Sequence, residues 1–410
     1  MNTAAYFVSP KTLRRIHEGP LGAYVEDLAA LLQEQQYSQS SARGMIRAVA
    51  KWSRWLSKRH FACADVDAEL LDQYLEQVGG SGQDDRRFLR RMLAWLQTTG
   101  VARAERTSPV LGQCEIVRDD FGRYLLRERG LSPSTLKCYL PYISQFLAQR
   151  FGDQSIDLEA LVAEDVTGFV QRNSHSLSHA RVEHLVTGLR AFLRYLRHLG
   201  KISIDLAACV PTVANWSFST LPKCLRPGQV EQILDHCDRS TSKGRRDYAI
   251  LLLLARLGLR AGEVAALRLD DIDWEQGDLT VRSKGGRWTK LPIPHDVGNA
   301  ITSYLANGRP SCSDRHVFLC ELAPRRGFAA STAVSTVVRH ALLGAGIESA
   351  RKGAHLLRHS LATDMLAKGA SLREIGEVLR HRSPDTTQLY AKVDIASLER
   401  LALPWPGEKP

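Results

Sequence analysis

The chain has 410 residues, of which 44% are hydrophobic and 24% are charged. That length exceeds what one hydrophobic core usually organises, so we expect two or three domains. The composition is that of a folded chain and excludes wholesale disorder. The longest uncharged apolar run is the eight-residue segment Tyr248–Ala255, whereas a membrane-spanning helix needs about 18–20 such residues. Together with a start that lacks the pattern of a secretory signal, this predicts a soluble, cytoplasmic protein with no membrane partner.

Basic residues outnumber acidic residues by 55 to 44, which gives a formal net charge of +11. The last 200 residues hold most of the surplus, with 28 basic and 21 acidic side chains. Such a charge is typical of proteins that bind a polyanion such as nucleic acid, and it equally fits a protein that is basic only for solubility. Charge alone therefore does not decide the function.

The cysteines give no sign of a disulfide framework or a metal site. There are eight of them, and no CxxC motif occurs. Cys312, His316 and Cys320 follow one another at intervals of four, but the nearby Pro310 disfavours a helix and a fourth ligand is missing. We expect scattered, reduced thiols and no metal.

The first half of the sequence looks duplicated. A polar helix start near Ser38 is followed by apolar residues at helical spacing, and the same pattern returns near Ser132, 94 residues later. Residues 90–100 also match residues 190–200. Each copy predicts four or five amphipathic helices, and the period is too long for a solenoid repeat. We therefore expect two similar helical domains in tandem, with chance similarity between amphipathic helices as the alternative.

Two stretches interrupt the helical pattern and are candidate linkers. Residues 103–112 separate the two copies, and residues 210–227 carry three prolines that favour an extended path. The sequence thus predicts an N-terminal helical domain over 1–102, a second helical domain over 113–210 and a third domain over 226–410.

The last domain mixes helices with a hairpin. A helix is predicted near 228–239, and the next, over 247–257, is apolar nearly all round, as a helix at the centre of a core must be. In segments 278–283 and 288–293, apolar and polar residues alternate, and a Lys-Gly-Gly-Arg tip lies between the two segments. This pattern is typical of a β-hairpin. The remainder after residue 331 looks helical. The predicted fold is mainly α with a small antiparallel β-sheet in the C-terminal domain.

Side chains with related chemistry stand at the ends and turns of these elements. Arg260 follows a glycine turn after the buried helix, and Lys284 lies at the hairpin tip. His355 and Arg358 are three residues apart and so share one helix face.

Two more such residues follow near the C-terminus. His381 comes after a helix that a Ser371–Glu374 capping box opens. Tyr390 comes nine residues later, in a segment where Ser383 can cap a helix and Pro384 can take its first position.

Two arginines, a lysine, two histidines and a tyrosine suit a phosphodiester. Guanidinium groups can neutralise the equatorial oxygens of a phosphoryl group bidentately. A phenol has a pKa of about 10 and is a poor nucleophile until cations favour its anion, and a lysine can protonate the departing 5′-oxygen. A tyrosyl phosphate link keeps the bond energy, so rejoining needs no ATP, and no GxxxxGK[ST] loop is present.

At these residues the sequence resembles the tyrosine recombinase (phage integrase) family, which includes integrases, Xer-type resolvases and related transposases. Residues 257–273 resemble the first box of that family, with its arginine at Arg260 and the acidic residue that supports it at Glu263. The family positions fall on six residues of this chain: Arg260, Lys284, His355, Arg358, His381 and Tyr390.

The resemblance covers most of the chain. It runs from about 226 to 401, and residues 113–210 look like the core-binding domain of the family. The departure lies at the front, where a further core-binding-like copy over 20–102 replaces the short arm-binding module of some integrases.

The resemblance implies a mechanism without a cofactor. Tyr390 would attack the scissile phosphate to give a 3′-phosphotyrosyl link, and Lys284 would act as general acid. Arg260, Arg358, His355 and His381 would stabilise the transition state, with His355 also a candidate proton acceptor. His359 and Arg382 flank catalytic positions and are expected to contact phosphate or support the structure. Basic residues are the candidates for DNA contacts: Arg43, Arg47, Lys137, Arg287 and Arg382.

The implied partner is double-stranded DNA with specific recombination sites, bound by four protomers, with accessory recombinases or DNA-bending proteins as further candidates. The implied outcome is integration, excision or transposition of a mobile element. The alternatives are Xer-like dimer resolution, DNA inversion, a type IB topoisomerase-like enzyme and a non-catalytic DNA-binding protein. Asp270, Asp271 and Asp273 could also indicate a two-metal nuclease, but acids clustered between a helix and a strand are usually a solvated turn.

Overall fold

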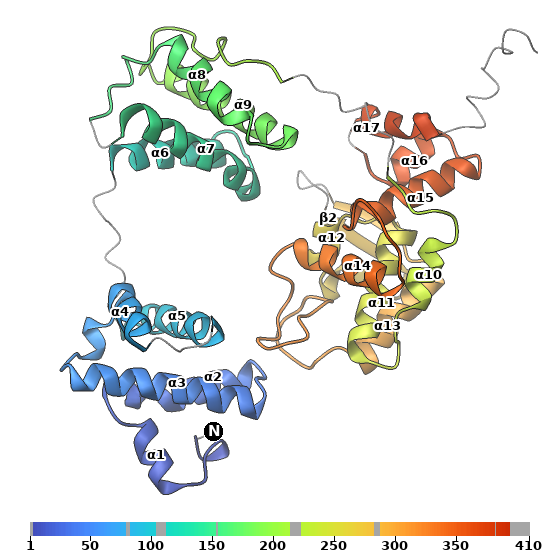
Figure 1. Ribbon diagram of the computed structural model, residues 1–410. Coiled ribbons are helices and arrows are strands. Elements are labelled where there is room, and N and C mark those ends of the chain that lie inside the picture. The colour runs from blue at the N-terminus through green and yellow to red at the C-terminus, as the bar shows by residue number, and fades with distance from the viewer. Residues whose placement is uncertain are drawn as a thin grey trace, which may run out of the picture. The chain divides into compact units, whose positions relative to one another are not determined.

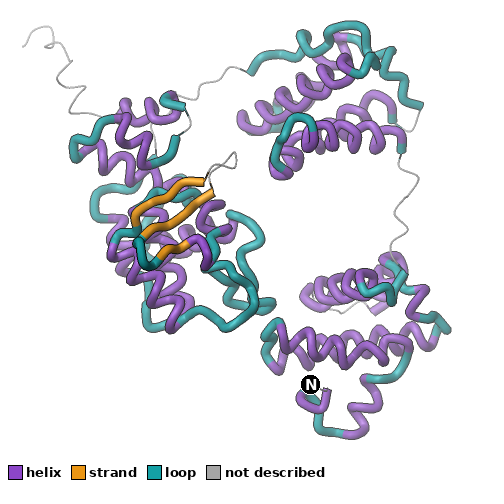
Figure 2. The backbone as a smooth tube through the Cα atoms, turned by 180° about the vertical axis from the view of Figure 1, so that it is seen from behind, coloured by secondary structure: helices purple, strands orange, loops and turns teal. Residues whose placement is uncertain are grey.

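The computed structural model describes residues 3–78, 83–103, 112–152, 155–213, 223–282, 288–381 and 383–393 (Figure 1). Their regular structure is helical apart from one three-stranded antiparallel sheet (Figure 2), which confirms the predicted fold class. The chain divides into two compact units, one of Met1–Leu93 with Phe218–Pro410 and one of Ala94–Ser217. The two predicted linkers lie largely outside the described residues. None of the helices described is both long and apolar enough to cross a membrane.

The N-terminal part is built around one long helix. Its elements are η1 (Thr3–Ala5), α1 (Pro10–Ile16), η2 (Pro20–Tyr24), α2 (Val25–Glu34), α3 (Gln39–Lys58), η3 (Cys63–Asp65), α4 (Ala68–Val78) and α5 (Gln83–Thr98). Helices α1 and α2 pack against α3. Ile46, Val49 and Trp52 of α3 are fully buried, because apolar residues at helical spacing give α3 one apolar face.

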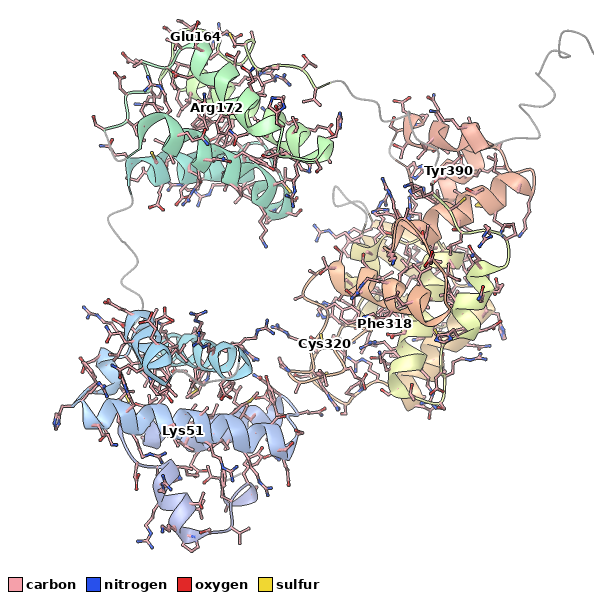
Figure 3. All side chains as sticks on the ribbon, viewed as in Figure 1. Lys51, Glu164, Arg172, Phe318, Cys320 and Tyr390 are labelled. Atoms are coloured by element: carbon pink, nitrogen blue, oxygen red, sulfur yellow. The ribbon has the colours of Figure 1, made fainter. Side chains whose placement is uncertain are left out.

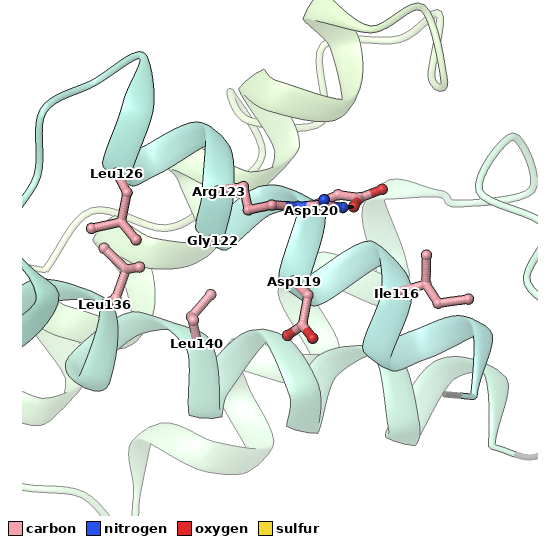
Figure 4. Close-up of a pocket in the computed structure, with 8 residues that line it drawn as sticks. All are labelled: Ile116, Asp119, Asp120, Gly122, Arg123, Leu126, Leu136 and Leu140. Atoms are coloured by element: carbon pink, nitrogen blue, oxygen red, sulfur yellow. Dashed lines mark hydrogen bonds and ion pairs between the residues drawn. The ribbon is translucent and has the colours of Figure 1, made fainter. Parts of the chain in front are cut away.

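The second unit contains α6 (Gln113–Arg127), α7 (Pro133–Phe151), α8 (Ala163–Ser174) and α9 (His179–His198). Phenylalanines fill its core in two edge-to-face pairs, Phe121 with Phe192 and Phe146 with Phe169, each with ring centroids 5.2 Å apart. A groove between α6 and α7 is lined by residues that include Ile116, Leu126, Leu136 and Leu140 (Figure 4). None of the predicted site residues lines this groove.

The helices of the two predicted copies begin and end in similar ways. The hydroxyl of Ser38 accepts a hydrogen bond from the backbone nitrogen of Ser41 at the start of α3, and Ser132 does the same for Thr135 at the start of α7. Soon after α5 and α9 the chain takes a left-handed conformation, at Gly100 with φ 74° and at Gly200 with φ 68°. The two copies therefore share these helix boundaries.

The C-terminal part combines helices with the sheet. The elements are α10 (Gln229–Asp235), α11 (Ser242–Arg256), α12 (Ala261–Ala266), η4 (Leu269–Asp271), β1 (Ile272–Asp273), β2 (Asp278–Arg282), β3 (Trp288–Pro292), α13 (His295–Asn307), α14 (Thr332–Gly344), α15 (His355–Ala367), α16 (Leu372–Val378), α17 (Asp385–Gln388) and η5 (Leu389–Val393). Pro384 stands at the N-cap of α17 rather than at its first helical position as predicted.

The sheet confirms the predicted hairpin and adds a strand to it. Strands β2 and β3 are antiparallel, with Arg282 opposite Trp288 beside the tip. Strand β1 pairs with the other edge of β2, where Ile272 lies opposite Leu279. The sequence prediction missed β1, because its neighbouring acidic residues were assigned to a solvated turn and the strand has only two residues.

Helix α11 is the centre of the C-terminal core. Residues 249–254 are at most 1% exposed, and α13, α14 and α15 pack around the helix (Figure 1). It begins at Ser242 rather than at the predicted residue 247, because the hydroxyl of Thr241 caps it by accepting from the backbone nitrogen of Gly244 at 3.0 Å. The turn after α11 passes through Gly258, at φ 56°, and leads to Arg260.

Replacing Gly258 with alanine should destabilise the fold. The new Cβ would lie 2.6 Å from Cδ2 of Leu379 and 3.1 Å from Cδ2 of Leu361, and a left-handed conformation costs a non-glycine residue about 1–2 kcal/mol. We expect a loss of at least about 1–2 kcal/mol in the free energy of unfolding, measured by urea denaturation followed by circular dichroism. Gly262→Ala is the control, since nothing lies within 4 Å of its Cβ position in α12. Equal losses in both variants would contradict this account of the turn.

Candidate active site

Arg260 and Glu263 form the first part of the site, at the start of α12. Arg260 is the N-cap residue, and its backbone nitrogen donates to Oε2 of Glu263 at 2.9 Å while its Nη1 donates to Oε1 at 2.8 Å. The Glu263 side chain is only 4% exposed, whereas that of Arg260 is 28% exposed. The carboxylate also lies where a helix N-terminus favours negative charge. Glu263 thus fixes a guanidinium group that still reaches the surface.

Arg380 holds the other side of the same carboxylate. Its Nη2 lies 3.1 Å from Oε2 of Glu263, and it also donates to the carbonyl oxygens of Leu257 and Gly258. The backbone of Arg380 has φ 55°, in the left-handed region, and its own carbonyl accepts from Nη2 of Arg260 at 3.2 Å. The end of α16 is thereby tied to the start of α12.

Arg358 is a third guanidinium group, 4% exposed on the first turn of α15. Its terminal nitrogens donate to the carbonyl oxygens of Gly258 and Leu379. Burial, together with the nearby charges of Arg260 and Arg380, lowers the pKa of Arg358 to about 10, so the group is still charged at neutral pH. Among the residues described, Glu263 is the one carboxylate that forms ion pairs with this cluster. The cluster therefore has a surplus of positive charge that suits an anion.

Two histidines lie beside the arginines. Nδ1 of His381 lies 2.8 Å from the hydroxyl of the buried Thr387. Burial and the charge of Arg358 lower the pKa of His381 to about 4. His355 begins α15, and desolvation followed by the charge of Arg358 lowers its pKa as well. Both imidazoles are neutral at pH 7, so each can donate a hydrogen bond from one nitrogen and accept at the other.

Tyr390 is buried, with 1% of its surface exposed. It lies in η5 (Figure 3). It packs with Ala362, Ile375 and Leu379. Its ring stacks on that of His381, with centroids 6.4 Å apart and planes 3° apart. Its hydroxyl lies 2.8 Å from Nδ1 of His359. Burial raises the pKa of Tyr390 to about 12, so the phenol is protonated in this structure.

The structure brings most of the predicted catalytic positions together. Five of the six lie around the arginine cluster and the Tyr390 ring, together with the supporting Glu263: Arg260, His355, Arg358, His381 and Tyr390. The sixth, Lys284, lies outside the described residues, as do Arg287 and Arg382. Arg43 and Arg47 belong to α3 and Lys137 to α7, so none of these three is part of the cluster.

Sequence reasoning missed two residues that hold the site and one contact. Arg380 was not singled out, since two arginines flank His381 and nothing in their spacing tells which one turns inward. Thr387 was not assigned a role either, although it lies one helical turn before Tyr390. His359 was expected to contact phosphate or support the structure, and its hydrogen bond to the Tyr390 hydroxyl was not foreseen.

The acidic residues near β1 form an ion pair and hydrogen bonds with neighbouring parts of the C-terminal domain. Asp270 pairs with Arg315, Asp271 accepts from the backbone nitrogen of Arg268, and Asp273 accepts from that of Gln276. Across the described ranges, no group of three or more His, Cys, Asp or Glu side chains is arranged to hold a metal ion. All eight cysteines are described, and none is in a disulfide.

The sequence matches known proteins over its whole length. Residues 223–396 match the model of the phage integrase family. The chain is 43% identical over 406 residues to an integrase/recombinase of Sinorhizobium fredii, a match that covers 98% of this chain and 99% of the relative. It is 32% identical over 285 residues to the tyrosine recombinase XerD of Listeria innocua, which covers 67% of this chain and 93% of that protein.

Solved structures share the fold. The XerH site-specific recombinase in a post-cleavage complex with its palindromic difH substrate matches with a TM-score of 0.57 and 18% identity, over 77% of this chain and 94% of that one. The Tn1549 transposon integrase bound to a circular intermediate DNA matches with a TM-score of 0.51 and 18% identity, over 70% of this chain and 99% of that one.

Acid should destabilise the protein over a pH range that is set by two half-buried imidazoles, those of His359 and His381. His359 and His381 have pKa values of about 4 in the folded chain and about 6.5 when unfolded. Between these values the unfolded chain binds more protons, so the free energy of unfolding should fall as the pH drops from about 6.5 towards 4. Urea denaturation at a series of pH values measures this slope. His381→Asn should reduce it, whereas the exposed His340→Gln should not; an unchanged slope in His381→Asn would contradict the assignment.

Proposed function

This chain belongs to the phage integrase family and is a tyrosine recombinase, and we infer that it breaks and rejoins DNA at specific sites through a covalent link between Tyr390 and a backbone phosphate. The observation that carries this proposal is the surplus of positive charge that Arg260, Arg358 and Arg380 create around one carboxylate, close to the Tyr390 ring. A scissile phosphate is the counter-ion that such a site lacks.

In the proposed reaction, the Tyr390 oxygen attacks phosphorus and the 5′-oxygen leaves. The product is a 3′-phosphotyrosyl link with a free 5′-hydroxyl, which receives its proton from Lys284. Arg260 and Arg358 neutralise the non-bridging oxygens, as planar guanidinium groups do in phosphoryl transfer. His355 and His381 donate hydrogen bonds to the same oxygens. Attack by a 5′-hydroxyl of another strand reverses these steps and completes the exchange.

The proposed substrate is duplex DNA that carries specific recombination sites. Similar structures are those of a recombinase with its difH substrate and a transposon integrase with a circular intermediate DNA, which supports this choice. We favour integration, excision or transposition of a mobile element as the outcome. Dimer resolution, inversion, topoisomerase-like relaxation and catalysis-free binding are the alternatives. A nicked suicide substrate separates strand transfer from topoisomerase-like relaxation and from catalysis-free binding, because only a site-specific strand transferase accumulates a covalent complex at one sequence and then joins a second strand. The DNA beside the gene distinguishes integration, resolution and inversion.

The same family membership supports a proposal for the assembly. We propose that the domains 1–102, 113–210 and 226–410 bind DNA together, and that four protomers act on two sites in the cytoplasm. Accessory recombinases or DNA-bending proteins are further proposed partners. No cofactor is needed, since the two guanidinium groups and the lysine supply the charge and the proton.

A basic face on α3 supports DNA contact by the N-terminal part. Five basic residues and no acidic ones lie in α3, and their spacing of four, four, three and four places them on one face: Arg43, Arg47, Lys51, Arg54 and Lys58. None of the five forms an ion pair with any residue that the structure describes. Backbone carbonyls orient two of them, since Arg43 donates to Tyr6 at 2.6 Å and Arg54 to Arg15 at 3.1 Å.

The dimensions of this basic face suit a duplex. It extends about 22 Å along the helix, and that length of duplex carries roughly thirteen phosphate charges. Lys137, which follows Arg43 by the 94 residues of the internal repeat, is exposed on α7 and is proposed to contact phosphate in the same way.

Tyr390→Phe should bind DNA as the wild type does and form no covalent complex. The substitution removes the nucleophilic oxygen and keeps the ring that packs between the last helices. A nicked duplex that carries the site, followed by denaturing electrophoresis, measures covalent complex, and a mobility shift measures binding. A covalent DNA adduct in Tyr390→Phe would show that another residue is the nucleophile.

Neutralising the basic face should weaken DNA binding and its dependence on salt. A triple variant, Arg47→Gln, Lys51→Gln and Lys58→Gln, should reduce the slope of log affinity against log salt by roughly 0.9 for each phosphate that the variant no longer neutralises. The control is a triple glutamine variant at Arg123, Lys368 and Arg373, which changes the net charge equally but removes residues already paired with carboxylates. Equal slopes in the two variants would rule out a specific role for α3.

A further inference from the structure

The geometry points to His359 as the group that takes the phenolic proton of Tyr390 when the DNA strand is cut. This inference rests on the proposed strand-transfer reaction and adds to it the residue that activates the nucleophile. Its basis is the distance of 2.8 Å between Nδ1 of His359 and the hydroxyl oxygen of Tyr390. The two rings lie with their centroids 5.7 Å apart.

Two other polar side chains near the phenol, His381 and Arg358, form hydrogen bonds elsewhere. The His381 ring lies parallel to the Tyr390 ring, with centroids 6.4 Å apart, and its Nδ1 faces the Thr387 hydroxyl at 2.8 Å. The guanidinium nitrogens of Arg358 donate to two carbonyl oxygens, and a guanidinium group has no acceptor. His355 lies one turn before His359 on α15, with ring centroids 6.4 Å apart. His359 is therefore the described side chain whose hydrogen bond reaches the reacting oxygen.

The protonation states permit the phenol to donate to His359. Burial, followed by the charges of His355 and Arg351, lowers the pKa of His359 to about 4, while burial raises the pKa of Tyr390 to about 12. The imidazole is neutral at pH 7, and in the tautomer that carries its ring proton on Nε2 the Nδ1 atom accepts from the phenol. The proposed proton transfer uses this tautomer. In the DNA-free site the proton accordingly stays on Tyr390 and the nucleophile is held in its unreactive form.

Proton transfer becomes favourable only as the new bond forms. When the Tyr390 oxygen bonds to phosphorus, the phenolic oxygen loses its affinity for a proton, and a neighbouring imidazole can accept that proton in the transition state. The oxygen–phosphorus bond to Tyr390 forms, the bond to the 5′-oxygen breaks, one proton passes to Nδ1 of His359, and Lys284 supplies one to the 5′-oxygen. During rejoining each proton returns to the group that gave it. His359 thus ties deprotonation to the presence of a phosphate.

The first experiment compares His359→Gln and His359→Phe with the wild type in single-turnover cleavage of a nicked suicide substrate. Glutamine can accept the phenolic hydrogen bond but cannot keep the proton, so both variants should cleave roughly 10²–10⁴-fold more slowly. DNA affinity should be unchanged, because the hydrogen bond of His359 goes to the Tyr390 hydroxyl and other side chains are the proposed ligands of the phosphate oxygens. His340→Gln, an exposed histidine on α14, is the control and should cleave at the wild-type rate. Wild-type cleavage by His359→Gln would overturn the inference.

A second experiment separates proton transfer from packing. Fluorinated tyrosine, whose phenol is more acidic, is introduced at position 390 in both the wild type and His359→Gln. If His359 takes the proton, the more acidic phenol needs less help and should restore much of the lost rate in His359→Gln. If His359 only supports the structure, the fluorinated phenol should give no recovery, and the inference fails.

The two levels of the proposal fail in different ways. If the wild-type chain forms no covalent complex with any tested site while it binds that site, the strand-transfer function itself is wrong. If the wild type forms the complex and His359→Gln forms it equally fast, only the assignment of His359 is wrong.

Discussion

The site depends on one buried carboxylate that has to serve more than one guanidinium group. Glu263 bonds to Arg260 on one side and to Arg380 on the other, while the hydrogen bonds of Arg358 within the described part of the chain go to the carbonyl oxygens of Gly258 and Leu379. Burying charge without a full set of counter-ions is costly. Burial and the charges of neighbouring arginines lower the pKa values of Arg358 and Arg380. These lowered pKa values express the same cost, because they show that the charged form of each group is destabilised. A bound phosphate would supply the missing counter-ion and remove this electrostatic cost. The free energy released in this way would favour binding of the substrate.

In the proposed mechanism, the same environment keeps the nucleophile, Tyr390, inactive until a substrate is present. Burial raises the pKa of Tyr390 while the charge of Arg358 opposes that rise, and burial has the larger effect. Tyr390 is 1% exposed and packs with Ala362, Ile375 and Leu379, so little of the phenol reaches the surface in the DNA-free chain. A protonated, covered tyrosine cannot attack water-exposed phosphates at random. In this proposal, the packing around Tyr390 keeps the phenol unreactive in the free enzyme and also places it where a bound phosphate would activate it.

Much of the fold could be predicted because hydrophobic periodicity is local. The apolar stretch of α11, the hairpin of β2 and β3, and the capping box at Ser371 follow from neighbouring residues, and the structure has all three. Strand β1 was missed because a two-residue strand has no periodicity to detect. Helix ends shifted by a few residues where a cap such as Thr241 outweighed the apolar pattern.

The site was predictable in its chemistry and not in its contacts. The family resemblance located Arg260, Arg358 and Tyr390 along the chain, and each does lie at the arginine cluster or beside it. Arg380 enters the site because its backbone takes a left-handed conformation, which no local signal marks in a non-glycine residue. The contact between His359 and Tyr390 joins residues 31 positions apart and depends on how α15 and η5 pack. Both the position of Arg380 and the contact between His359 and Tyr390 depend on tertiary packing, which cannot be read from a single sequence.

The most direct measurement is to identify the residue that carries a nucleotide after the chain has been trapped on a nicked duplex, by mass spectrometry of the digested complex. We expect a single adduct, a 3′-phosphate ester on the Tyr390 oxygen. A nucleotide attached to any other side chain, or a trapped complex with unmodified Tyr390, would contradict the claim that the arginine cluster presents a DNA phosphate to this phenol.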